Sequence, residues 1–309
     1  MGLLSVTIDL DEIDCYLAIH GLDSVAAATV KHAVYKKALP RVADFFDKLE
    51  VKATLFVVGK DITTPEGAAA IRAFSSRGHE IGNHTMSHPY DFSMMPTAKQ
   101  TREIAEAEDA VKAAIGHKPV GFRAPGYNIN MGVVELLRQQ HYLYDSSVFP
   151  CPTYYAAKAG AIGLKQMQGR KSKSIMGDPR ILTAPTTPYK IGHDGVWTRS
   201  DDGLREVPIT VVTKARLPFI GTSIAVMGKT AAKLFAKQAA KLSMVNLELH
   251  GIDFIDAEQD GLVFLKPHQP DLRKPLSKRT ASLETAVKTL LDAGLDPAPL
   301  RDVATRLFI

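Results

Sequence analysis

Residues 39–59, LPRVADFFDKLEVKATLFVVG, place a helical pattern directly before a strand pattern. The apolar side chains with helical spacing in the first half are Val42, Phe45, Phe46 and Leu49. They predict an amphipathic helix over Leu39–Leu49. Ala53–Val58 is rich in β-forming residues and ends at Gly59, which predicts a short buried strand. A helix followed at once by a buried strand indicates an α/β chain.

The same alternation continues on both sides of this stretch. Further strands are predicted at Leu3–Leu10, Glu80–His84, Val120–Phe122, Val207–Val212 and Val245–Leu249. Further helices are predicted at 66–77, 97–115, 131–140, 228–243 and 280–293, with a short helix at the C-terminus. Strands that alternate with helices favour βα units and a parallel sheet. We therefore expect one barrel-like α/β domain over 1–309, with elaborations at 12–37 and at the long predicted loop 151–206.

Composition excludes several classes of protein. Of 309 residues, 45% are hydrophobic and 23% are charged, which argues against a disordered or collagen-like chain. No apolar run is long enough for a transmembrane helix, and residues 1–6 lack the pattern of a secretory signal. The two cysteines, Cys15 and Cys151, are too few for a disulfide framework. These features predict a cytoplasmic protein.

The net charge of +5 is unevenly distributed. Acidic residues are in excess in residues 1–150 and basic residues in 151–309, which favours an anionic ligand, a membrane surface or nucleic acid as partner. Aromatic residues are only 7% and do not interleave with the basic runs, so we expect no nucleic-acid binding. A basic stripe recurs every four residues: Lys229, Lys233, Lys237 and Lys241. It fits either a solvated helix face or peripheral contact with an anionic membrane surface.

The first of three polar clusters is Thr7–Glu12, at the end of the first predicted strand. Asp9 and Asp11 lie two residues apart and therefore point to the same face of a strand. Two carboxylates there fit a metal ligand beside a general base. A solvated strand end fits them equally well.

The second cluster is His79–Pro89. His84 and His88 lie four residues apart, which puts both imidazoles on one face if the segment turns helically. Two imidazoles with one carboxylate make a site for a first-row metal ion that leaves positions open for water or substrate. Two polar histidines near a turn are the alternative interpretation.

The third cluster is Gly121–Tyr127. Arg123 has the chemistry to orient a carboxylate. Pro125 and Gly126 favour a turn whose backbone N–H groups point into a site as an oxyanion hole. By itself this stretch is also typical of an ordinary loop.

Together and in this order, the clusters resemble the NodB-type polysaccharide deacetylases of carbohydrate esterase family four. The matching stretches are Thr7–Asp11, Ala53–Gly59, Arg77–His88, Arg123–Tyr127, Tyr144–Ser147 and Leu247–His250. Leu10 separates the two carboxylates, a spacing similar to that of an atypical branch that includes cytosolic deacetylases. The resemblance implies a distorted (β/α) barrel of the NodB deacetylase type.

The resemblance also implies a role for each matching residue. Asp11, His84 and His88 would bind a divalent metal ion, Asp9 would be the general base and His250 the general acid. Arg123 would hold Asp9, Asp145 would tune the acid side, and the N–H near Gly126 would face the developing oxyanion. Zinc is the default ion, and nickel, cobalt and iron share this ligand set. The chemistry agrees, because an amide needs a polarised carbonyl and a protonated leaving amine.

The implied reaction is removal of an N-acyl group, acetyl or formyl, from an amino sugar. A cytoplasmic enzyme would meet soluble precursors, nucleotide sugars or lipid-linked sugars as substrates. Tyr127, Phe149 and Trp197 are the candidate substrate contacts. Leu204–Thr210 is loosely similar to deformylases of undecaprenyl-linked aminoarabinose, which would act at the inner face of the membrane. An amidase for a small non-sugar amide and a catalytically silent sugar-binding module are the alternatives, although binding alone requires neither Asp9 nor His250. The residues do not indicate an oligomeric state.

Overall fold

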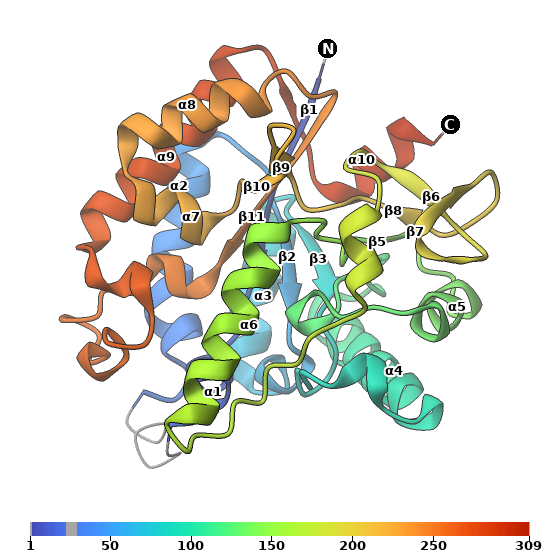
Figure 1. Ribbon diagram of the computed structural model, residues 1–309, viewed down its shortest axis with the longest axis horizontal. Coiled ribbons are helices and arrows are strands. Elements are labelled where there is room, and N and C mark those ends of the chain that lie inside the picture. The colour runs from blue at the N-terminus through green and yellow to red at the C-terminus, as the bar shows by residue number, and fades with distance from the viewer. Residues whose placement is uncertain (1, 23–29, 309) are drawn as a thin grey trace.

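The computed structural model describes residues 2–22 and 30–308 and shows a curled α/β sheet flanked by helices (Figure 1). The main sheet has ten strands in the order β11-β1-β2-β3-β4-β5-β8-β6-β7, with β12 beside β1. The strands from β11 to β8 in that order pair in parallel, whereas β6 and β7 pair antiparallel. The bounds are β1 Leu3–Asp9, β2 Thr54–Val57, β3 Glu80–Asn83, β4 Gly121–Phe122, β5 Tyr144–Asp145, β6 Tyr189–Gly192, β7 Gly195–Ser200, β8 Arg205–Glu206, β11 Met244–His250 and β12 Asp296–Pro297. β9 (Val211–Val212) and β10 (Leu217–Pro218) form a separate pair. The predicted distorted barrel is confirmed.

Helices follow most of the parallel strands, as βα units require. Their bounds are α1 Ile13–His20, α2 Leu39–Leu49, α3 Pro65–Ser76, α4 Thr97–Ile115, α5 Met131–Gln139, α6 Pro152–Met167, α7 Gly221–Met227, α8 Lys229–Ala239, α9 Leu276–Asp292 and α10 Leu300–Leu307. In Figure 1, α8 and α9 pack together on the left and α4 and α5 lie on the right. Among the described residues, no helix combines the length and the apolar character needed to cross a bilayer.

The core forms where strands are covered on both faces. Every residue of β1, β2 and β3 is buried, which is typical of central strands in a parallel sheet. The α2 helix packs its apolar face into this core through the four residues predicted above. Its bounds agree with the prediction because a strongly amphipathic helix carries its own signal.

The carboxyl ends of the parallel strands bring distant residues together. In the register between β1 and β11, Asp9 lies beside His250 and Thr7 lies beside Glu248. β3 leads into His84 and β4 leads into Arg123, so four strands deliver polar side chains to one edge of the sheet. Ligand sites of α/β proteins form at this edge.

The prediction of a long loop over 151–206 is wrong. The segment contains α6, the β6–β7 hairpin and β8. The α6 helix carries Gly160 and Gly163, and Tyr155 is its one buried side chain, so its sequence shows no stripe of core residues. Pro152 at its first position was a start signal that the sequence offered.

The predicted strand Val207–Val212 shortens to β9 at its last two residues. Pro208 lacks a backbone N–H, which removes one rung from a regular ladder. The preceding residues are nevertheless held, because Val207 N–H donates to Asp145 O and Ile209 N–H donates to Val148 O. The segment is thus an extended connection rather than a strand.

Candidate active site

The predicted metal ligands converge on one point. The Oδ1 atom of Asp11 lies 3.3 Å from Nε2 of His84 and 3.4 Å from Nε2 of His88. All three residues are buried, and one ligand atom from each lies within 4.8 Å of the others. A carboxylate with two imidazoles is a donor set that suits zinc and its first-row neighbours.

The hydrogen bonds around these residues fit a metal ion. Nδ1 of His84 lies 2.7 Å from the carbonyl oxygen of Arg123, which can only accept, so in the neutral ring Nδ1 carries the hydrogen and Nε2 keeps a lone pair. Asp11 Oδ1 and both ring nitrogens of His88 are buried without a hydrogen-bond partner among the described residues. Such atoms are costly unless a cation fills the space between them. The residues therefore fit a bound divalent ion.

The electrostatics point the same way. Burial opposes ionisation of Asp11, yet the neighbouring His88 and His84 outweigh it, and the pKa of Asp11 lies well below its usual value. Burial lowers the pKa of His84, but Asp9 and Asp11 raise it above its usual value. The site therefore has a negative field that favours a positive charge between these side chains.

The segment from His84 to His88 is not helical, contrary to the expectation for the two imidazoles. Thr85 and His88 adopt left-handed backbone conformations with φ of 66° and 56°. The turn is held because Thr85 N–H donates to Asn83 Oδ1 (2.8 Å) and His88 N–H donates to Thr85 Oγ1 (3.1 Å). Left-handed non-glycine residues are strained and cluster at functional sites. The imidazoles thus meet through a tight turn rather than through helical spacing.

Asp9 is held by Arg123, as the resemblance implied. Arg123 Nη1 donates to Asp9 Oδ1 (2.6 Å) and to Thr7 Oγ1 (3.1 Å), while Nε and Nη2 donate to Ser146 O and Oγ. Arg123 is completely buried and lies over the ring of Phe56. Burial raises the pKa of Asp9 against the opposing charge of Arg123. Asp9 is thereby oriented and made more basic than an exposed aspartate.

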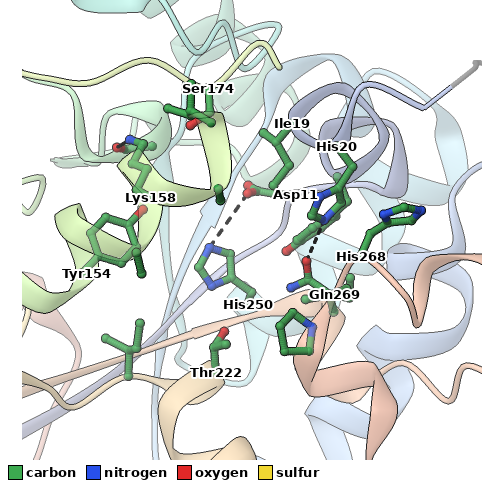
Figure 2. Close-up of a pocket in the computed structure, with 18 of the residues that line it drawn as sticks. Asp11, Ile19, His20, Tyr154, Lys158, Ser174, Thr222, His250, His268 and Gln269 are labelled. Carbon is green, nitrogen blue, oxygen red and sulfur yellow. Dashed lines mark hydrogen bonds and ion pairs between the residues drawn. The ribbon is translucent and has the colours of Figure 1, made fainter. Parts of the chain in front are cut away.

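His250 is paired with Glu248, a residue that sequence analysis did not single out. His250 Nδ1 lies 2.7 Å from Glu248 Oε1, and the hydroxyl of Tyr127 donates to the same oxygen (3.0 Å). Burial lowers the pKa of His250, but the Glu248 carboxylate raises it well above its usual value. The other ring nitrogen, Nε2, lies 3.9 Å from Asp11 Oδ2, as Figure 2 shows. Residues two positions apart in a strand point to the same face. The spacing of Glu248 and His250 in the sequence could therefore have predicted that they pair.

Asp145 lies in a different network from the one expected. Its carboxylate accepts from the N–H (3.1 Å) and the hydroxyl (2.7 Å) of Ser147, and it neighbours Glu206 across the β5–β8 register. The Ser147 hydroxyl in turn accepts from Ala124 N–H (2.8 Å). Asp145 thus supports the loop after Arg123, and Glu248 is the carboxylate that contacts His250. A tuning role for Asp145 stays a prediction.

The three candidate substrate contacts are placed differently. Tyr127 lines the cleft above the site, whereas Phe149 is completely buried behind Tyr127 and Tyr154. Trp197 lies on β7 with the guanidinium of Arg180 over its ring, and it is not among the described residues that line the cleft. This geometry therefore argues against direct substrate contact by Phe149 or Trp197.

The site opens into a cleft of about 1130 Å³. Asp9, Asp11, His84 and His250 line its floor together with Gly126. Figure 2 shows α6 with Tyr154 and Lys158 on one wall, Thr222 on the other, and His250 between them. Gly126 has a φ of 60°, which glycine adopts at little cost. The predicted oxyanion loop therefore borders the same space as the metal ligands.

Three lysines of the basic stripe lie on the solvent side of α8, and Lys241 follows the end of that helix. Lys229, Lys233, Lys237 and Lys241 are exposed, while Ala232, Ala236 and Ala239 face the core. A solvated helix face accounts for this arrangement. Membrane contact by the stripe stays a prediction.

The chain is similar in sequence to known proteins. Residues 24–144 match the family model described as polysaccharide deacetylase. The matched segment covers less than half of the chain. It contains Arg123 and the His84–His88 motif. A peptidoglycan deacetylase of Helicobacter pylori (strain ATCC 700392 / 26695) is 26% identical over 149 residues, which is 47% of this chain and 49% of that protein. The aligned part thus spans about half the length of that relative.

Solved structures share the fold of the polysaccharide deacetylase family. A Pseudomonas aeruginosa PAO1 protein described as a "probable Polysaccharide deacetylase" superposes with a TM-score of 0.61 at 15% identity, covering 98% of this chain and 89% of the other. Puue allantoinase superposes with a TM-score of 0.59 at 14% identity, again over 98% and 89%. At these identities the likeness concerns the fold alone, so the substrate has to be argued from the site.

Proposed function

We propose that this protein is a metal-dependent hydrolase that removes an N-acyl group, acetyl or formyl, from an amino sugar. The single observation that carries the proposal is that Asp9, Asp11, His84 and His250 line the floor of one cleft, with His88 grouped against Asp11 and His84. The match of residues 24–144 to the polysaccharide deacetylase family supports the amide of an amino sugar as the bond that is cleaved.

Asp11, His84 and His88 would hold the metal ion. A divalent ion bound there polarises a carbonyl group and acidifies a water molecule. The unpartnered oxygen of Asp11 and ring nitrogens of His88 are the atoms that favour such an ion. Zinc is the ion we propose, because this donor set is typical of zinc sites with positions left open for substrate.

Asp9 takes the proton of the attacking water. Its Oδ1 is occupied by Arg123 at 2.6 Å, which leaves Oδ2 directed toward His84 at 3.9 Å. The raised pKa of this buried carboxyl makes it a stronger base. The water oxygen then bonds to the carbonyl carbon of the amide.

His250 delivers a proton to the leaving amine. Glu248 holds Nδ1, so Nε2 is the atom that faces the cleft and donates the proton. The carbon–nitrogen bond breaks as the nitrogen is protonated, because an unprotonated amide ion is a poor leaving group. The products are a carboxylic acid and a free amine, and the proton taken up by Asp9 restores His250.

The cleft bears on the alternatives. The cleft volume of about 1130 Å³ exceeds the range of about 300–1,000 Å³ that is typical of small-ligand sites. The cleft therefore has room for a sugar ring, and its size does not favour the small-amide alternative. A silent binding module would require neither Asp9 nor His250 in these positions.

The test is mass spectrometry of bacterial sugar fractions, lipid-linked and water-soluble, after incubation with metal-replete protein. We expect loss of an acetyl or formyl group from an amino sugar with the wild type and no loss with Asp9→Asn. No change in either fraction with metal-replete wild-type protein would contradict the proposed activity.

A further inference from the structure

One face of the α6 helix lines the cleft without being covered by protein. Its cleft-facing apolar residues, at helical spacing, are Ala157, Ala161, Ile162 and Leu164. Within the described chain, Tyr155 is the one buried side chain among the sixteen residues of this helix. Leu164 is 57% exposed. An apolar helix face normally packs against a core. Because no core covers this face, we infer that a ligand bound in the cleft covers it.

The wall opposite α6 also carries exposed apolar residues, beside the polar Thr222 and Ser223. Val226 and Met227 of α7 line the cleft and are 39% and 36% exposed. Ile19 of α1 contributes from a third side. Against these apolar residues a chain of sugars would lose hydrogen bonds to water that the apolar side chains cannot replace. An alkyl chain would gain from the same burial.

The lysines on this face of α6 are already engaged. Lys158 Nζ donates to the carbonyl oxygen of Gly126 (3.2 Å), and Lys165 Nζ donates to that of Ile19 (2.7 Å). Their head groups hold α6 across the cleft, and their methylene stems add to the apolar lining. These side chains thus tie α6 to the Gly126 loop and to α1.

The position of α7 indicates which half of the substrate lies between the apolar walls. α7 packs against β11, the strand that carries His250, and Thr222 of α7 lines the cleft beside His250 in Figure 2. In the proposed reaction His250 protonates the leaving amine, so the amine half lies on the α7 side. We propose that the amine half of the substrate carries an alkyl chain, which lies between α6 and α7. This inference rests on the proposed function, which it narrows to an amphiphilic amino-sugar substrate.

The experiment compares N-acetylglucosaminides that carry methyl, butyl and octyl aglycones, each below its critical micelle concentration. Acetate release is measured with zinc-loaded full-length protein. Each buried methylene contributes about fourfold in affinity, so KM should fall at least tenfold from methyl to octyl. A KM that does not change along the series would overturn the inference.

Two matched variants locate the effect. Ala161→Glu places a charge on the lining face, and Ala159→Glu places the same charge on an exposed position of α6 outside the lining. The ratio of the KM values for methyl and octyl should collapse at least fivefold in Ala161→Glu and persist in Ala159→Glu. The same ratio in both variants would contradict an alkyl chain along α6.

A binding arm separates this inference from the proposed function. Calorimetric titration of Asp9→Asn with the methyl and octyl glycosides measures affinity without turnover. Chain-dependent affinity without acetate release from the wild type would keep the apolar cleft and refute the deacylation. Acetate release with equal affinity for both glycosides would keep the deacylation and refute the alkyl chain.

Discussion

Glu248 Oε1 lies 2.7 Å from Nδ1 of His250, and this pair joins a buried and a partly buried position of one strand that share a face. Burial alone would lower the pKa of the imidazole, but the carboxylate keeps that pKa well above its usual value. The raised pKa favours the protonated form of His250, which has a proton to give. The Tyr127 hydroxyl shares the same Glu248 oxygen and helps to fix its orientation.

Replacing Glu248 by Gln should therefore weaken the acid. The pKa of His250 falls when the carboxylate charge is removed, so the alkaline limb of the pH–rate profile should move to lower pH. We expect kcat to fall by about 10- to 100-fold, since the general acid itself is worth about 100- to 10,000-fold. The measurement is kcat against pH. An unchanged alkaline limb in Glu248→Gln would show that this pair does not tune the acid.

The Asp9–Arg123 pair predicts a stability effect. Removing one partner of a buried ion pair leaves the other charge uncompensated, so Arg123→Met should lower the free energy of unfolding by about 3–5 kcal/mol. Adding Asp9→Asn removes the orphaned charge, and the double variant should regain part of the loss. Urea unfolding of both single variants and the double variant measures this coupling. Strictly additive losses would argue that the pair is not coupled.

Asp61, which has no part in the proposed reaction, should make the free energy of unfolding depend on pH. Burial raises the pKa of Asp61 to about 7, and its Oδ2 has no hydrogen-bond partner within the part of the chain that the structure describes. A folded pKa above the unfolded value of about 3.9 favours folding of the protonated form, so this contribution is complete below about pH 4 and is lost as pH rises through 7. Asp61→Asn cannot ionise. It should be more stable than wild type by up to about 4 kcal/mol at pH 8, with the gap shrinking toward pH 4.

Urea unfolding of chelator-treated wild type and Asp61→Asn at pH 4, 6 and 8 checks this prediction. Chelation is needed because metal release at low pH would add its own pH dependence. A constant difference across the three pH values would refute the raised pKa.

Metal binding should stabilise the fold. A ligand that binds the folded state alone raises the free energy of unfolding by about 2.7 kcal/mol at a concentration 100 times its Kd. Zinc should therefore raise the melting temperature of wild type and of Asp9→Asn, and it should have no such effect on His84→Ala. Thermal unfolding with and without zinc measures this. A full zinc effect in His84→Ala would place the metal elsewhere.

Local patterns in the sequence predicted the parts of the fold that carry their own signal. The α2 helix and the buried strands β1 to β3 agree with prediction because their apolar residues face a core. The α6 helix was missed because its apolar face looks into the cleft and not into a core. Without a stripe of core residues, a helix is not distinguishable from a loop by apolar periodicity alone.

The site shows the same division. Asp11, His84 and His88 were grouped by a motif, and the structure brings them together. The pairing of Glu248 with His250, and of Asp145 with Ser147 and Glu206, depends on which strands become neighbours. That register joins residues far apart in the chain, which one sequence alone does not reveal.

The most direct test of the account measures bound metal and acetate release on the same preparations of wild type, Asp9→Asn and His84→Ala, with an N-acetylglucosaminide as substrate. Wild type should bind equimolar metal and release acetate. Asp9→Asn should keep the metal and lose turnover by about 100-fold or more, and His84→Ala should lose both. Wild-type turnover in Asp9→Asn would contradict the assignment of the base, and full metal content in His84→Ala would contradict the metal centre.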